Sequence, residues 1–191
     1  MARENLYSII IEIPKKENNY LKEITEKISK IMDLNETRNE FHLTIESTLC
    51  CSDNGFRFNL NNWLETQSPF QLTLNKLDRF ENQKGGIIYL TTKNLDEKNK
   101  ICDLHYGIHE TIKSRSSKKH FVPHITLLSD VPREKIKKLE DRFSENIKPF
   151  KITVSEVLVN KKIDNYNWKN FGRFSLGKYD LDDFTESSLL L

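Results

Sequence analysis

Two short segments of the chain share the pattern histidine, any residue, threonine. They are His42 to Thr44 within FHLTI and His124 to Thr126 within FVPHITLL. In a β-strand, side chains two residues apart point to the same face, so each segment would present an imidazole and a hydroxyl together, backed by apolar residues. If two such strands face one cleft, both imidazoles and both hydroxyls would surround a single phosphodiester.

This set of groups is suited to cleaving a phosphodiester without a metal ion. A histidine with an ordinary pKa of about 6.5 can accept or donate a proton at neutral pH, and a positioned proton transfer accelerates a reaction by roughly 10²- to 10⁴-fold. Threonine hydroxyls donate hydrogen bonds to the nonbridging oxygens. We predict His42 and His124 as acid and base in either order, Thr44 and Thr126 as phosphate ligands, and no cofactor or metal.

Hydrophobic periodicity predicts the elements that must position these residues. We expect both motifs to lie in strands, each preceded by an amphipathic helix, with Asn18 or Asn19 capping the first helix. The first half is expected to contain a strand over 6–13, a helix over 20–31, a strand over 41–45, a short helix over 59–66 and paired strands over 70–80 and 87–92. The second half is expected to contain a helix over 95–112, a strand over 121–128, a helix over 132–147 and strands over 150–159 and 171–176 joined by a long hairpin tip.

The order of these elements is β-α-β-(α)-β-β followed by α-β-α-β-β, which makes two similarly built halves. Strands joined by short turns favour antiparallel pairing, so the fold class predicted is α+β, with helices covering antiparallel sheets. At 191 residues, the chain suits one domain with two closely packed lobes over residues 1–191.

The sequence resembles the two-histidine (2H) phosphoesterases, which include 2'-5' RNA ligase-like proteins and cyclic phosphodiesterases. The likeness rests on YSIIIEIP, FHLTI, FQLTLNKLDRF before IIYLTT, FVPHITLL and FGRFSLG, and it spans nearly the whole chain. It implies a bilobal fold with two pseudo-symmetric antiparallel sheets, outer helices and a central cleft. The implied substrates are 2',3'-cyclic phosphates, 2'-5' linked oligonucleotides such as 2'-5' oligoadenylate, cyclic oligonucleotides, or RNA 3' ends. Several relatives place a basic residue soon after the second motif, whereas this chain has Ser129 and Asp130.

Composition excludes several other classes of protein. With 37% hydrophobic and 30% charged residues, the chain has the balance of a globular protein, and no apolar run reaches membrane-spanning length. The N-terminus lacks a signal-peptide pattern, and three cysteines do not form a disulfide framework, so we expect a cytoplasmic protein. A net charge of +2 is too small for nonspecific binding to duplex nucleic acid. RNA, an oligonucleotide or a cyclic nucleotide is the expected partner, with no membrane and no obligate protein partner.

Two polar segments are candidates for holding the substrate. Tyr166 and Trp168 alternate with lysines in NKKIDNYNWKN, where a ring could stack on a base, although a solvated hairpin tip has the same composition. Lys119 and His120 precede the second motif and could form a flap over the substrate, although basic runs are usually solvated loops.

Two alternative functions are open at this point. A noncatalytic module that binds nucleotides or RNA would keep the same cleft, although both complete motifs argue against it. His105 and His109 have the spacing of two zinc ligands on a helix, but the glutamate of an HExxH motif is missing. These two histidines therefore fit better as residues that flank a buried helical stripe at the solvent boundary.

Overall fold

The computed structural model describes residues 5–34, 38–50, 53–81, 83, 85–114, 121–136, 147–164 and 167–178. The order of its helices and strands follows the periodicity, except that the strands predicted over 70–80 and 150–159 are each divided into two. In order they are β1 (Asn5–Glu12), α1 (Lys15–Met32), β2 (His42–Cys50), α2 (Asp53–Leu64), β3 (Phe70–Leu74), β4 (Lys76–Glu81), β5 (Gly86–Thr91), α3 (Leu95–Thr111), β6 (Ile125–Val131), α4 (Arg133–Ile136), β7 (Phe150–Val154), β8 (Glu156–Lys162) and β9 (Trp168–Ser175).

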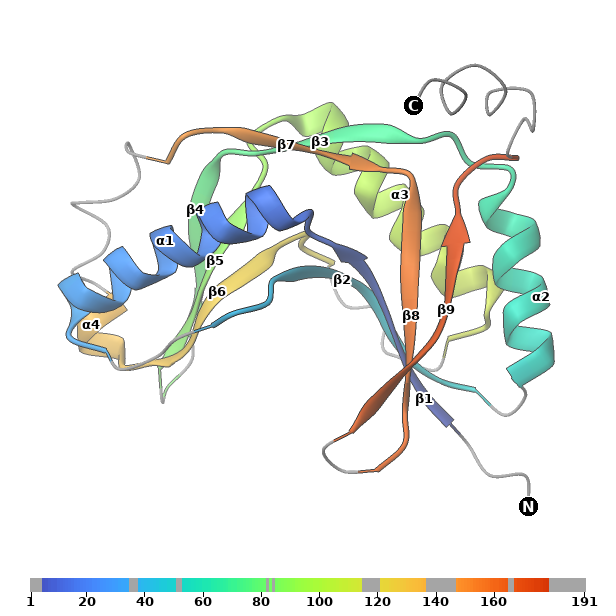
Figure 1. Cartoon of the computed structure of the whole chain (residues 1–191), viewed down its shortest axis with the longest axis horizontal. Coiled ribbons are helices and arrows are strands. Elements are labelled where there is room, and N and C mark those ends of the chain that lie inside the picture. Colours follow the sequence, from blue (N-terminus) through green and yellow to red (C-terminus); the bar gives the residue numbers. More distant parts are fainter. Residues whose placement is uncertain are drawn as a thin grey trace, which may run out of the picture.

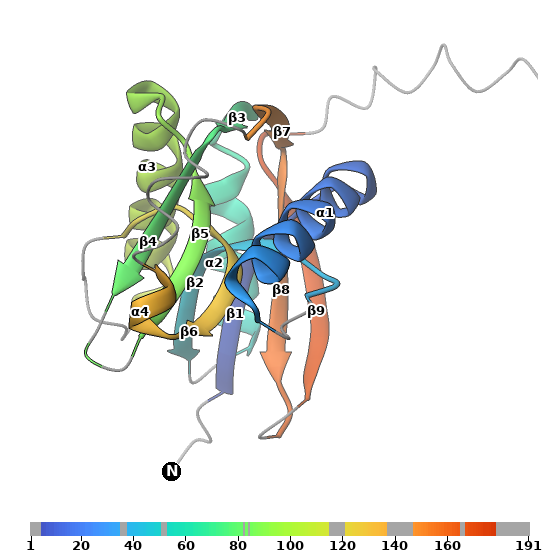
Figure 2. The same cartoon turned by 90° about the vertical axis from the view of Figure 1, so that its left-hand side faces the viewer.

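All strand pairs of the two sheets are antiparallel, which confirms the predicted α+β class. The large sheet has the strand order β4-β5-β6-β2-β1-β8-β9, and β3 pairs with β7 in a separate two-stranded sheet. Both motif strands, β2 and β6, are therefore neighbours in the middle of the large sheet. Figures 1 and 2 show the curved large sheet with α1 and α3 on opposite sides of it, and with β3 and β7 crossing one end.

The predicted single strand over 70–80 is wrong, because the chain changes sheets at Asn75. β3 pairs with β7, whereas β4 pairs with β5. The Asn75 side chain accepts a hydrogen bond from the backbone N–H of Lys93, and its own backbone N–H donates to the carbonyl of Thr91. Asparagine readily forms such local bonds, so it breaks an otherwise regular alternation that has no Gly or Pro to mark the break.

The starts of two helices differ from those predicted. α1 starts at Lys15 with Pro14 at its N-cap, because a proline there has no N–H to leave unsatisfied. Neither Asn18 nor Asn19 caps this helix; the Asn18 amide instead bonds the backbone of Asn39 and Phe41, tying α1 to the segment that enters β2. α2 begins at Asp53, well before residue 59. The first turn of the helix predicted over 132–147 is present as α4, and residues 137–146 lie outside the described residues.

The hairpin at the C-terminal end of the sheet has a shorter tip than predicted. β8 and β9 continue into the polar segment, and Lys162 pairs with Trp168. The N–H of Ile163 donates to the carbonyl of Asn167, which closes the turn. Strand pairing here continues through charged residues because the outer face of the strands is solvated and places no apolar requirement on them.

The hydrophobic core lies between the large sheet and the helices. Its fully buried members include Tyr7, Ile9 and Leu43 from the sheet, and Leu60 and Ile108 from α2 and α3. No helix of the described residues is both long and apolar enough to cross a membrane. Leu43 of β2 and Ile125 of β6 are turned into this core, so the polar residues of the two motifs lie on the opposite face of their strands.

Candidate functional site

The two motifs meet at the contact between β2 and β6. The register pairs Leu43 with Ile125, the central residue of each motif, and both side chains are fully buried. Because neighbouring side chains point to the opposite face, the four flanking polar residues share the face away from the core. Continued by one residue each way, the register sets His42 across from Thr126 and Thr44 across from His124. The four groups form a quadrilateral with a local two-fold axis through the Leu43–Ile125 pair.

The strand predicted to start at residue 121 starts at Ile125, so His124 lies just before β6. The preceding backbone is anchored in another way, since the Thr91 hydroxyl donates to the carbonyl of Pro123 at 2.6 Å. His124 Nδ1 lies 2.7 Å from the carbonyl of Val122, and because a carbonyl only accepts, Nδ1 carries the proton. The neutral ring is therefore held as the tautomer whose Nε2 has a free lone pair.

Two aromatic rings pack against His124. Tyr89 lies across from Thr126 on β5, and its ring centroid is 5.1 Å from that of His124; the Phe80 ring approaches it edge-on at 5.2 Å. Burial, together with the nearby Asp78 carboxylate, raises the pKa of Tyr89 to about 12. Tyr89 is thus a hydrogen-bonding phenol at neutral pH and not a charged group.

His42 is exposed in the cleft and lies near a cation. Arg38 donates a hydrogen bond from its guanidinium to the carbonyl of Thr126 at 3.0 Å, so it connects the segment before the first motif to the second motif. Partial desolvation by the cleft walls lowers the pKa of His42, and the Arg38 charge lowers it further. Glu40 opposes this shift, and nearby His124 adds a smaller lowering effect. Burial also lowers the pKa of His124, offset in part by the bond to Val122.

These directions predict the pH profile of a two-histidine reaction. The reaction needs one ring protonated and the other neutral, a state most populated between the two apparent pKa values of the coupled pair. Because both pKa values are lowered from about 6.5, we expect kcat/KM to peak below about pH 6.5 and to fall toward about pH 8 as the acid loses its proton. Measuring kcat/KM from about pH 4.5 to about pH 9 checks this. A rate that keeps rising through about pH 8 would contradict it.

A β-bulge in β2 turns the acidic side chain of Glu46 away from the face that carries the two motifs. Ile10 pairs with Thr44 but Ile9 pairs with Glu46, so Ile45 is an extra residue on β2. A regular strand would place Glu46 on the same face as Thr44, and the bulge turns it to the core side instead. The carboxylate is therefore kept away from the face that carries the imidazoles.

His105 and His109 of α3 stabilise the bulge from the core side. His105 Nδ1 donates to the carbonyl of Ile45 at 2.7 Å, and His109 Nδ1 lies 2.8 Å from a carboxylate oxygen of Glu46. Both histidines and Glu46 are buried, so the expected position of the histidines at the solvent boundary is wrong. The structure thus uses these rings to satisfy buried acceptors, which is a structural use and not the zinc site considered above.

Removing His109 is therefore expected to destabilise the fold strongly. The variant His109→Ala leaves the Glu46 carboxylate buried without this partner, which typically costs about 3 kcal/mol or more in the free energy of unfolding. Denaturant unfolding of the variant and the wild type measures the difference. Glu46→Gln is the matched control and should lose less, because its amide oxygen still accepts from His109. A loss below about 1 kcal/mol for His109→Ala would show that the pair is not a structural anchor.

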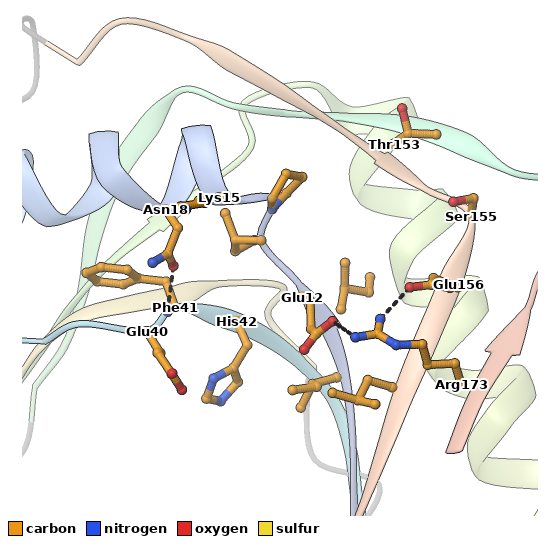
Figure 3. Close-up of a pocket in the computed structure, with 15 residues that line it drawn as sticks. Glu12, Lys15, Asn18, Glu40, Phe41, His42, Thr153, Ser155, Glu156 and Arg173 are labelled. Carbon is orange, nitrogen blue, oxygen red and sulfur yellow. Dashed lines mark hydrogen bonds and ion pairs between the residues drawn. The ribbon is translucent and has the colours of Figure 1, made fainter. Parts of the chain in front are cut away.

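A cavity of about 600 Å³ opens beside His42. It lies between the start of α1, the entry to β2 and the strands β7, β8 and β9, as Figure 3 shows. Arg173 of β9 forms ion pairs with Glu12 and with Glu156 in one of its walls. Ile10 and Leu158 give it an apolar floor.

The predicted substrate-binding residues lie outside this arrangement or outside the described residues. Tyr166, Lys119 and His120 belong to the latter group. Trp168 is 46% exposed at the start of β9 and does not line the cavity.

Sequence reasoning missed the residues that surround the motifs. Tyr89 had a usable signal, because the alternation of IIYLTT places it opposite the apolar Ile88 and Leu90. Arg38 and Arg173 had none, since the partners of each are fixed only by the fold.

Comparisons with known proteins agree with this architecture. A profile of the 2'-5' RNA ligase superfamily matches residues 52–163, a range that includes the second motif and begins after the first. A search of curated protein sequences finds no match. Among solved structures, E. coli LigT in its apo form is similar with a TM-score of 0.68 and 16% identity, covering 92% of this chain and 99% of LigT. LigT complexed with 3'-AMP gives a TM-score of 0.68 at 15% identity, covering 92% of this chain and 100% of that one.

A third similar structure is that of TT0787 from Thermus thermophilus, with a TM-score of 0.63 and 15% identity over 92% of this chain and 100% of that protein. These likenesses establish the two-sheet fold predicted from the resemblance to two-histidine phosphoesterases. The profile match covers more than half of the sequence. The chain therefore belongs to the 2'-5' RNA ligase superfamily.

Proposed function

We propose that this protein is a metal-independent phosphodiesterase that acts on RNA or oligonucleotides carrying 2',3'-cyclic phosphate or 2'-5' linkages. The single observation that supports it most is the pairing of Leu43 with Ile125, which sets His42, Thr44, His124 and Thr126 on one face. Membership of the superfamily supports a phosphodiesterase or RNA-processing role.

In the proposed mechanism the phosphorus lies above the Leu43–Ile125 pair. One imidazole removes a proton from the attacking water or ribose hydroxyl, and the other protonates the leaving ribose oxygen. Thr44 and Thr126 donate hydrogen bonds to the nonbridging oxygens, which gain charge in the transition state. Diagonal placement of the two histidines across the strands puts one ring on each side of the phosphate, as in-line displacement requires.

The fixed tautomer of His124 favours it as the general base. Its Nδ1 proton is held by Val122, so the neutral ring offers a lone pair on Nε2 without rearrangement. His42 then acts as the acid, and its protonated form is favoured once the substrate phosphate adds negative charge beside it. Arg38 supplies a positive charge next to His42, in place of the basic residue that relatives carry after the second motif.

The proposal is tested with a substrate panel. Purified protein is incubated with 2',3'-cyclic nucleotides, 2'-5' oligoadenylate, 3'-5' RNA and a cyclic oligonucleotide, with and without EDTA, and the products are resolved by phosphate position. We expect cleavage of a cyclic phosphate or a 2'-5' linkage, unchanged by EDTA. Tight nucleotide binding without turnover of any member would instead favour the noncatalytic module.

A further inference from the structure

We infer that the cavity beside His42 is a subsite for a nucleoside whose base carries an exocyclic amino group. This rests on the proposed function and specifies its substrate. At about 600 Å³, the cavity lies within the usual range of small-molecule sites, which is roughly 300–1,000 Å³. Because His42 forms one of its walls, a nucleoside in the cavity would be joined to a phosphate lying next to that ring.

The floor of the cavity suits the flat face of a base. Ile10 of β1 and Leu158 of β8 are paired across the sheet and are 7% and 6% exposed. They are on the same face as Thr44, which pairs with Ile10. An apolar floor that continues directly from the motif face would support a heterocycle while its sugar phosphate reaches the imidazoles.

Two polar donors that line the cavity, Arg173 and Asn18, already have partners within the protein, and Lys15, Thr153 and Ser155 line it as further polar groups. The Arg173 guanidinium binds Glu12 with one nitrogen and Glu156 with another, at 2.5 Å for the latter. The Asn18 side chain donates to the carbonyl of Asn39 and accepts from the N–H of Phe41. These two side chains are thus held as parts of the wall.

In the wall that holds Arg173, the remaining hydrogen-bonding capacity lies on carboxylate acceptors. Glu12 and Glu156 each engage Arg173 through one carboxylate oxygen, and Glu40 is exposed at the rim beside His42. Figure 3 shows the Glu12 carboxylate between His42 and Arg173. A ligand that complements this wall must itself supply N–H and O–H donors, as an amino-bearing base and a ribose do.

Glu12 is the residue placed to discriminate between bases. A carboxylate accepts a hydrogen bond from the amino group of adenine, cytosine or guanine, whereas the corresponding edge of uracil presents a carbonyl oxygen that the carboxylate repels. A site built to accept such a donor rejects a ligand lacking it, because its own polar group is left unpaired. The subsite should therefore prefer adenosine or cytidine over uridine.

The test compares kcat/KM for the 2',3'-cyclic phosphates of adenosine, cytidine and uridine. In the wild type we expect the two amino-bearing substrates to exceed the uridine substrate by about tenfold or more. Glu12→Gln should bring the ratio close to one, because a glutamine can present either its oxygen or its amide N–H to the base. Glu156→Gln is the matched control, since it removes the other partner of Arg173, and it should keep the preference.

Three outcomes would overturn the inference: a wild-type preference for uridine, an undiminished preference in Glu12→Gln, or equal loss of preference in both variants. Equal loss in both variants would mean that the ion pairs with Arg173 maintain the shape of the cavity. Glu12 would then not discriminate between bases by binding their amino group. Thermal unfolding of each variant checks that the fold is retained. Calorimetric binding of adenosine, cytidine and uridine to the wild type and Glu12→Gln reports on the subsite without turnover, so failure of the proposed catalysis is distinguishable from failure of the subsite.

Discussion

Replacing either His42 or His124 by alanine is expected to lower kcat by about 10²- to 10⁴-fold, the usual contribution of one positioned acid or base. His42 is exposed, so its removal should change the free energy of unfolding by only about 0.5 kcal/mol or less. His124 packs against Phe80 and Tyr89, and its loss should cost somewhat more stability. Single-turnover rates on the best substrate of the panel measure the effect, with denaturant unfolding as the check on folding.

The double variant tests whether His42 and His124 act together on one phosphorus or contribute to the rate independently. If both rings act on the same phosphorus, the loss in the His42→Ala, His124→Ala double variant should be far smaller than the product of the two single losses. Single variants that keep wild-type turnover would exclude the two-histidine mechanism.

Replacing Thr44 or Thr126 by valine is expected to lower kcat by about 10²-fold, as removal of one donor to a developing oxyanion does elsewhere. Valine has nearly the shape of threonine and lacks the hydroxyl, and both positions are half-buried in strands that accept β-branched residues. The substitution therefore removes the hydrogen bond with little change in packing. The comparison requires kcat and KM to be measured separately.

Threonine to serine at the same positions is the matched control, because the hydroxyl is retained. It should preserve most of kcat, whereas the valine variants should not. If valine raises KM at unchanged kcat, the hydroxyls bind ground state and transition state equally, and their proposed role in the transition state is wrong.

Much of the fold was predictable because its elements are strongly periodic. The helix over 95–112 and the strands that precede each helix have apolar stripes at regular spacing, and the structure confirms them. The misassigned 70–80 segment shows the limit of this approach. Periodicity reports that residues are extended, but the partner of an extended segment is set by long-range pairing, which for β3 is with β7, far along the chain.

The site, like the fold, was predictable from the sequence only in part. The face shared by His42 and Thr44 follows from the two-residue repeat of a strand. The bulge at Ile45, by contrast, has no local sequence mark, and without it Glu46 would share that face. The Arg38 contact to Thr126 and the Arg173 pairs with Glu12 and Glu156 join residues far apart in the sequence, so only the register of the folded sheet brings them to the cleft.

The most direct test of the account is a crystal structure of the protein with a nucleoside 2'-phosphate or 3'-phosphate product bound. We expect the phosphate to lie above the Leu43–Ile125 pair, with one imidazole nitrogen on each side of it and with both threonine hydroxyls within about 2.7–3.1 Å of its oxygens. A product phosphate that contacts only one of the two histidines, or that binds away from the face they share, would contradict it.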